Sequence, residues 1–308
     1  MLRTFFVRLS ENKSLRRFAE QSSLGHRVSS RFVAGTEISD AMRATQAVNR
    51  SGMSVTIDNL GENVTNPEEA RHSAQLYHQV LDAIAANHLD ANVSLKLTHM
   101  GLDVEEALAR DLVCGLVAKA ASMNPPGFVR VDMEGSPYTQ RTLDFVHELH
   151  RMPGHANSVG TVIQAYLKRS ESDVEKLLAE GIRIRLCKGA YKEPATIAFE
   201  KKADVDANYV RLMKILMKSG IYHGMATHDE KLIREIQAFA TRENAPRDAF
   251  EFQMLYGIRR DLQQRLIKEG WRMRVYIPFG TEWYPYFMRR LAERPANALF
   301  IAKNLFRN

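Results

Sequence analysis

Eight short apolar runs, separated by longer segments with helical periodicity, constrain this chain more than any other feature of its sequence. Each run has the length of a strand, and the segments between them repeat apolar residues at i, i+3, i+4 and i+7. Eight strands that each lead into a helix predict a closed (β/α)8 barrel of the TIM type, because an open doubly wound sheet gives no reason for eight units. The runs, from Ser54 onward, are SVTIDNL, NVSLKLTH, FVRVDME, SVGTVIQAYL, IRIRLCKGAY, IYHGMATHD, FEFQMLYG and RMRVYIPFG.

The repeats suggest how the chain is divided. Residues 1–53 read as short helices without a strand, and residues 54–308 contain all eight repeats. We therefore expect an N-terminal helical arm packed against a barrel. With 308 residues and a hydrophobic fraction of 45%, the chain can build a core of normal size. Cys114 and Cys187 lie far apart in sequence, so we expect two free thiols and a reducing compartment.

The net charge of +7 favours anionic partners, so a basic nucleic-acid-binding protein is one class to weigh. Such a protein would carry its charge on an outer face with interleaved aromatic residues, whereas the distinctive charges here occupy one parity of the strands. No apolar run is long enough to span a bilayer, and no spacing of His, Cys or carboxylate residues fits a metal site. We therefore expect no membrane span, no metal and no nucleic acid.

In the run IRIRLCKGAY the apolar side chains alternate with Arg183 and Arg185, so one face of the strand is apolar and the other is cationic. The apolar parity should meet the helices, and the other parity should face the barrel interior. The charges nearest the strand starts, Arg183, Arg130 and Glu251, are expected to form internal ion pairs. Barrel enzymes build their sites at the carboxyl ends of the strands. The inward-facing candidates there are Lys96, Asp132, Gln164, Arg185, Gln253 and Tyr276.

The last helical segment, PYFMRRLAERP, places two arginines, a tyrosine and a carboxylate on one face by their spacing of i, i+3, i+4 and i+7. Two adjacent guanidinium groups suit a bidentate clamp on a carboxylate ligand. A solvated basic helix end is the alternative, and Trp283 and Tyr284 just before the segment make a wet surface the weaker interpretation. The four residues are Tyr286, Arg289, Arg290 and Glu293.

Nine strings resemble the proline dehydrogenase (proline oxidase) family, one for each barrel unit and one for the last helix. They are DNLGE, SLKLTHMG, VDMEGS, IQAYLKRS, RLCKGAYKE, ATHD, FEFQMLYG, RVYIPFG and YFMRRLAERP. They extend in order from Asp58 nearly to the end of the chain, whose length is similar to that of the compact, monofunctional bacterial form. The resemblance implies a distorted (β/α)8 barrel that binds FAD and oxidises L-proline to Δ1-pyrroline-5-carboxylate. It also implies hydride transfer to flavin N5 and a membrane quinone as electron acceptor.

The resemblance further implies roles for individual residues. Arg185 is similar to the arginine beside flavin N5, and Asp132 to a polar anchor near flavin and substrate. Glu293 is similar to a residue that steadies an arginine of the substrate clamp. Further flavin contacts are implied for Gln164, Lys188, Gly189, Thr227 and His228. The implied carboxylate clamp is Lys96, Arg289 and Arg290, and the implied walls around the proline ring are Leu255, Tyr276 and Tyr286.

Two positions depart from the family pattern. Cys187 stands where an aliphatic residue is common, and a thiol near a flavin is open to oxidation. Val205 stands where members often have a threonine, which puts one hydrogen bond near the flavin in doubt. Neither position changes the resemblance itself.

Other hypotheses and partners stay open at this point. A Schiff-base aldolase with Lys96 as its nucleophile is a second enzymatic hypothesis, and it requires a lowered pKa for this lysine. We expect a cytoplasmic protein, with peripheral contact with the inner face of the cell membrane and homo-oligomer formation left open. Purified protein should be yellow if it binds flavin, and colourless under the aldolase and nucleic-acid hypotheses.

Overall fold

The structure, a computed structural model, describes residues 29–293 of the chain, with side chains described as far as Met288. Its eight strands are all parallel, pair in chain order and close into a barrel, which confirms the predicted fold class. The strands are β1 (Ser54–Asn59), β2 (Ala91–Leu95), β3 (Val129–Val131), β4 (Val159–Gln164), β5 (Arg183–Cys187), β6 (His223–Ala226), β7 (Phe250–Leu255) and β8 (Met273–Phe279).

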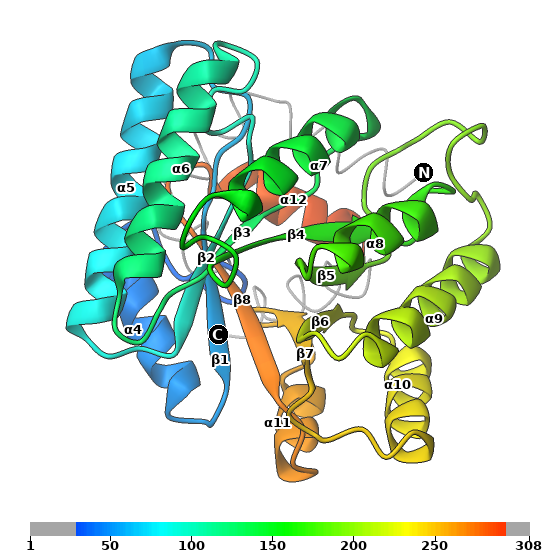
Figure 1. Cartoon of the computed structure of the whole chain (residues 1–308). Helices are drawn as coiled ribbons and strands as arrows, with labels where there is room; N and C mark the ends of the chain where they lie inside the picture. Colours follow the sequence, from blue (N-terminus) through cyan, green and yellow to red (C-terminus); the bar gives the residue numbers. More distant parts are fainter. Residues whose placement is uncertain (1–28, 294–308) are drawn as a thin grey trace.

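Helices follow every strand and surround the barrel (Figure 1). They are α5 (Pro67–Ala86), α6 (Glu106–Ser122), α7 (Ser136–Arg151), α8 (Ser170–Ala179), α9 (Lys202–Lys218), α10 (Glu230–Arg242), α11 (Arg260–Lys268) and α12 (Trp283–Glu293). Helix α4 (Ile38–Asn49) precedes the barrel, lies within the segment predicted as an arm, and packs against β1 and β8. The boundary at residue 53 stays a prediction, and residues 1–28 lie outside the described part of the chain.

The apolar parity of the strands packs against the helices, as predicted. Ile57, Leu95 and Leu186 are fully buried in the shared core of strands and helices. Burying each such side chain contributes roughly 1.5–3 kcal/mol. A one-residue slip of a strand would exchange these side chains for charged ones, so the alternation determines which face of each strand is turned inward.

Charges near the strand starts fill the lower part of the barrel interior. The expected ion pair forms for Glu251, whose Oε1 accepts a hydrogen bond from Nε of Arg274 over 2.7 Å. Arg183 and Arg130 have no ion pair with a described carboxylate, and the guanidinium of Arg183 lies 5.5 Å from the ring centroid of Phe128. Nη1 of Arg130 donates to the carbonyl oxygen of Thr161 over 2.9 Å. Its guanidinium also lies 4.8 Å from the ring centroid of Phe128. Burial lowers the pKa of Arg130, so this layer combines an ion pair with a cation held by a carbonyl group and a ring.

The last helix packs over the residues that follow the carboxyl ends of β1 and β7. The segment before α4 supports it, because Phe32 lies 6.0 Å from Phe287 between ring centroids. The same segment is fastened to the end of β8, where the N–H of Ala34 donates to the carbonyl oxygen of Pro278 over 2.9 Å. The cluster consists of Phe32, Val33, Leu60, Ile258, Trp283, Tyr284, Tyr286, Phe287 and Met288, with Leu255 packed against it.

Candidate active site

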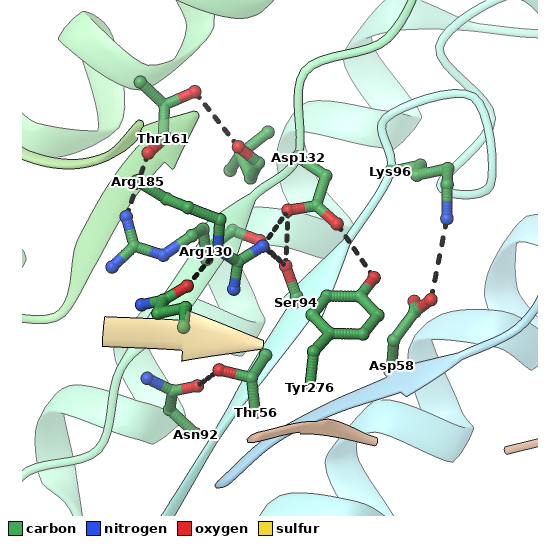
Figure 2. A network of polar contacts seen from close by, with 12 residues as sticks. Thr56, Asp58, Asn92, Ser94, Lys96, Arg130, Asp132, Thr161, Arg185 and Tyr276 are labelled. Atoms are coloured by element: carbon green, nitrogen blue, oxygen red, sulfur yellow. Dashed lines mark hydrogen bonds and ion pairs between the residues drawn. The ribbon is translucent and has the colours of Figure 1, made fainter. Parts of the chain in front are cut away.

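Arg185, near the carboxyl end of β5, is the centre of a hydrogen-bond network inside the barrel. Its Nε donates to Oε1 of Gln253 over 2.6 Å, and its Nη1 donates to Oδ1 of Asp132 over 2.7 Å. Ser94 and Tyr276 also donate to Asp132, over 2.6 and 3.0 Å, so both oxygens of this carboxylate are engaged. Figure 2 shows Asp132 between Arg185, Ser94 and Tyr276. The predicted residues Asp132, Arg185 and Tyr276 are therefore brought together.

These contacts hold the guanidinium of Arg185 in one orientation. Its Cζ lies 5.1 Å from the ring centroid of Tyr276, which adds a cation–π contact to the hydrogen bonds. The remaining nitrogen, Nη2, is buried and has no hydrogen-bond partner among the described residues. Leaving a buried donor without an acceptor costs free energy. The network therefore presents a fixed, charged donor that suits an acceptor atom of a bound molecule.

Lys96 follows β2, and its ammonium lies 3.7 Å from Oδ2 of Asp58 in β1 (Figure 2). Both side chains are largely buried, with 15% and 2% of their surfaces exposed. Burial alone would lower the pKa of Lys96, but the charges of Asp58 and Asp132 outweigh burial and raise it. Lys96 therefore stays protonated, which suits a carboxylate ligand. A protonated lysine opposes the aldolase hypothesis, because a Schiff base forms from the neutral amine.

Asp58 is a buried residue of this site that the sequence reasoning did not select. Burial raises the pKa of its carboxyl group, and Lys96 acts in the opposite direction. The signal that could have identified it was available, because Asp58 has the inward parity of the first strand and pairs in register with Ser94.

Residues predicted to contact a flavin lie at or beyond the carboxyl ends of β4, β5 and β6, which are neighbours in the barrel. At the end of β4, Nε2 of Gln164 donates to the carbonyl oxygen of Glu134 over 2.9 Å. Beyond β5, Gly189 has a φ of +107°, and a Cβ atom there would lie 2.1 Å from the ring of Tyr166. Glycine is therefore required for the chain to pass this ring.

The other predicted flavin contacts have partners within the protein. The ammonium of Lys188 lies 2.5 Å from Asp206 and 2.8 Å from Asp229. Oγ1 of Thr227 accepts the backbone N–H of Asp229 over 3.1 Å, and Nε2 of His228 accepts a backbone N–H at the end of β7 over 2.9 Å. These residues are thus held in place beside one another, and Lys188 would have to loosen an ion pair to bind a phosphate group.

Helix α12 carries the remaining predicted substrate residues. Tyr286 is 7% exposed and belongs to the apolar cluster against which Leu255 packs, so two predicted walls of the site share one cluster. The two aromatic residues that open the helix are also buried, which agrees with the interpretation that its start is not a wet surface. The side chains of Arg289, Arg290 and Glu293 lie outside the described residues, so the arginine clamp stays a prediction.

The two departures from the family pattern have different surroundings. Cys114 and Cys187 are both free, as predicted. Burial raises the pKa of Cys187 to about 12. Because the thiolate is the reactive form, this thiol is poorly suited to oxidation at neutral pH. Val205 packs against a small apolar cluster that includes Tyr166 and Leu167.

Other features of the described residues do not form a second site. No group of three or more His, Cys, Asp and Glu side chains in this part of the chain could hold a metal ion. None of its helices combines the length and apolar character needed to cross a bilayer. A cavity of about 570 Å³ lies between α7 and α8, outside the barrel, and the Arg151 and Arg169 side chains that line it are ion-paired. The network at Arg185, where three predicted residues meet, is the candidate active site.

Comparisons with known proteins agree on one family. A family model described as proline dehydrogenase matches residues 41–303. The chain is 42% identical to proline dehydrogenase 1 of Bacillus subtilis subsp. natto over 100% of both chains. It is also 42% identical to the proline dehydrogenase of Deinococcus radiodurans, over 90% of this chain and 89% of that one.

A solved structure gives the same fold. The crystal structure of proline utilization A from Bdellovibrio bacteriovorus, inactivated by N-propargylglycine, is similar with a TM-score of 0.81 and 26% sequence identity. The similarity covers 87% of this chain but 33% of that larger protein. The chain therefore corresponds to about a third of the length of its structural neighbour.

Proposed function

Because the chain belongs to the proline dehydrogenase family of enzymes, we propose that it oxidises L-proline to Δ1-pyrroline-5-carboxylate with a bound FAD. Bound FAD would supply the hydride acceptor, flavin N5, and the electrons would leave to a membrane quinone. The observation that carries the proposal is the buried guanidinium of Arg185, whose Nη2 has no acceptor among the described residues. A donor held in this way would stabilise the negative charge that develops on the flavin as it accepts the hydride.

The hydrogen bonds of Arg185 support its proposed role beside the flavin. Asp132 and Gln253 hold the guanidinium by hydrogen bonds of 2.7 and 2.6 Å, so it would need little reorganisation when charge develops during the reaction. Residues at or beyond the carboxyl ends of β4, β5 and β6 would hold the rest of the dinucleotide. They are Gln164, Lys188, Gly189, Thr227 and His228.

We propose that cationic side chains bind the carboxylate of proline and that apolar and aromatic side chains surround its ring. Lys96 supports this role because its raised pKa keeps it charged inside the barrel. Arg289 and Arg290 would complete the clamp, and Glu293 would steady one of them. The proposed walls are Leu255, Tyr276 and Tyr286.

The proton and the hydride leave the substrate separately in this proposal. The ammonium of proline must lose a proton first, because the nitrogen lone pair forms the C=N bond as hydride leaves. Hydride loss from the neutral amine gives the protonated imine, which then releases its N–H proton to give the imine product. We assign both protons to solvent, and we propose that the clamp orients the substrate. The apolar cluster around α12 would keep bulk water away from the reacting carbon.

The proposal extends to the partners and the place of action. With a net charge of +7, we expect a cytoplasmic protein that contacts anionic lipid peripherally and in a salt-sensitive way. The nucleic-acid alternative has less support, because the strand charges noted in the sequence, such as Arg185 and Glu251, are buried. We also propose the division into an N-terminal arm, residues 1–53, and a catalytic barrel, residues 54–308. The oligomeric state stays open.

An absorbance spectrum before and after anaerobic addition of L-proline tests the function. We expect yellow protein whose flavin bands bleach when proline is added, because the bound cofactor is reduced. A lysine-based aldolase or a nucleic-acid-binding protein would be colourless. Correctly folded protein that binds no FAD, even when FAD is supplied, would show that the proposal is wrong.

A further inference from the structure

A buried carboxylate in β1 has no role in the function proposed above. Asp58 is 1% exposed, and its Oδ2 lies 3.7 Å from the ammonium of Lys96 (Figure 2). A carboxylate so deeply buried is costly unless a cation or hydrogen-bond donors compensate it. The pair with Lys96 provides this compensation and joins β1 to the segment that follows β2.

Tyr77 holds Asp58 from outside the barrel. This tyrosine belongs to α5 and is fully buried. Its hydroxyl lies 2.7 Å from the carbonyl oxygen of Ser94 and 3.2 Å from Oδ1 of Asp58, and it accepts the N–H of Asn59 over 3.1 Å. Asp58 and Ser94 are the last residues paired between β1 and β2, so the phenol enters at the ends of these strands. Because Oδ1 of Asp58 contacts Tyr77, the other carboxylate oxygen, Oδ2, faces Lys96.

A second carboxylate near Lys96 is engaged in another way. Asp132 accepts hydrogen bonds from Arg185 over 2.7 Å and from Tyr276 over 3.0 Å. Both carboxylates raise the pKa of Lys96 against the effect of burial, and Asp58 contributes more than Asp132. The two carboxylates share Tyr276 but differ in the cation beside them: Asp132 is hydrogen-bonded to Arg185, and Asp58 is paired with Lys96.

We propose that Asp58 is a positioning residue that keeps the ammonium of Lys96 charged and directed at the substrate carboxylate, and that Tyr77 keeps Asp58 in place. The inference rests on the substrate role proposed above for Lys96. Without Asp58 the flexible lysine side chain loses its anchor and its nearest counter-charge. The effect falls on substrate binding more than on the chemical step, because Lys96 contacts the carboxylate and not the reacting carbon.

Steady-state kinetics of the flavin-bound enzyme test the positioning role. Asp58→Asn keeps the shape of the side chain and removes its charge, so we expect the KM for L-proline to rise about tenfold with kcat within about twofold of the parent. Tyr77→Phe should raise KM about threefold, because it removes one contact to Asp58.

Tyr209→Phe is the matched control. Tyr209 is a fully buried tyrosine of α9, and its hydroxyl lies 3.5 Å from the carbonyl oxygen of Leu186. The control removes the same atom from the same kind of site without touching Asp58. We expect it to leave the KM for L-proline at the parental value.

Reductive methylation followed by mass spectrometry provides a readout that does not depend on turnover. Lys96 of the flavin-bound parent should react slowly with formaldehyde and borane at about pH 8, because its raised pKa keeps it protonated. Asp58→Asn should lower the pKa of Lys96, since burial then acts with less opposition, and methylation should become several-fold faster. Tyr209→Phe should react like the parent.

A Lys96→Met variant separates this inference from the proposed function. If Lys96→Met leaves the KM for L-proline unchanged, the substrate role of Lys96 is wrong and the inference falls with it. If Lys96→Met raises KM while Asp58→Asn shows a parental KM or parental methylation, only the positioning role is overturned. If Asp58→Asn does not fold, Tyr77→Phe tests the positioning role instead. Equal KM values for Tyr77→Phe and Tyr209→Phe would then refute that role.

Discussion

Replacing Arg185 with lysine keeps a positive charge inside the barrel but removes the planar fork. The lysine ammonium is a compact charge on a flexible stem and cannot hold Asp132 and Gln253 in the geometry of the guanidinium. In the parent these two bonds measure 2.7 and 2.6 Å. Losing one buried, charge-assisted hydrogen bond costs roughly 1.5–3 kcal/mol. We therefore expect the free energy of unfolding of the flavin-free protein to fall by about 2 kcal/mol.

The same substitution should affect catalysis more strongly than folding. A preorganised donor aimed at developing charge typically contributes about 100-fold to 1000-fold in rate. Arg185→Lys removes Nη2, a buried donor that has no hydrogen-bond partner among the described residues. We expect the rate constant for flavin reduction by saturating L-proline to fall about 100-fold. Anaerobic stopped-flow absorbance measures this rate, and urea titration measures the stability.

Arg130→Lys is the control for a buried arginine lost elsewhere in the barrel. Arg130 is also inward-facing and buried, and its Nε likewise has no hydrogen-bond partner among the described residues. It lies near the start of its strand, away from the carboxyl ends, and its Nη1 donates to the carbonyl oxygen of Thr161 over 2.9 Å. We expect a comparable loss of stability and a rate of flavin reduction within about twofold of the parent. The reasoning is refuted if Arg185→Lys with full FAD occupancy reduces flavin at the parental rate, or if Arg130→Lys slows reduction equally.

Three further predictions follow from the charges of the chain. Arg289→Lys and Arg290→Lys should keep FAD and raise the KM for L-proline by about one to two decades. If both variants bind a carboxylate inhibitor such as tetrahydrofuroic acid as tightly as the parent, the two arginines do not form the clamp. Flotation with anionic vesicles should recover protein at low salt and lose it at high salt, and equal recovery would exclude a mainly electrostatic attachment. Burial lowers the pKa of His223 from 6.5 to about 3 and of His99 from 6.5 to about 4. Below about pH 6.5 these histidines therefore bind protons in the unfolded chain but stay neutral in the folded protein. The free energy of unfolding should fall as the pH drops below about 6.5, by up to about 1.4 kcal/mol per pH unit for each histidine. His223→Gln should reduce this dependence of stability on pH in urea titrations, and an unchanged dependence would contradict the prediction.

Sequence alone determined the barrel and the character of its interior. Strand and helix periodicities are local, so the eight alternating runs could be recognised without knowing what each would contact. The alternation at Arg183 and Arg185 showed which parity faces inward, because only one face of the strand could join an apolar core. The same logic identified Asp132, Arg185 and Tyr276 as members of one site at the carboxyl ends of the strands.

The pairing of those charges was decided by the closed barrel. Arg185 and Asp132 are 53 positions apart in sequence, and the curvature and register of β3 and β5 bring their side chains to 2.7 Å. The prediction of internal ion pairs was correct for Glu251 but not for Arg130, because distances between strands across a barrel cannot be read from the alternation within each strand.

Only the tertiary structure shows that Tyr77 of α5 contacts the ends of two barrel strands. In the sequence Tyr77 is one more apolar position of an amphipathic helix, with nothing to show that its hydroxyl reaches the ends of β1 and β2. That reach depends on how α5 lies against the barrel, which is a property of packing and not of periodicity. The sequence could name the charges of this site, but only the folded chain could show that Asp58 faces Lys96 and that Tyr77 holds it there.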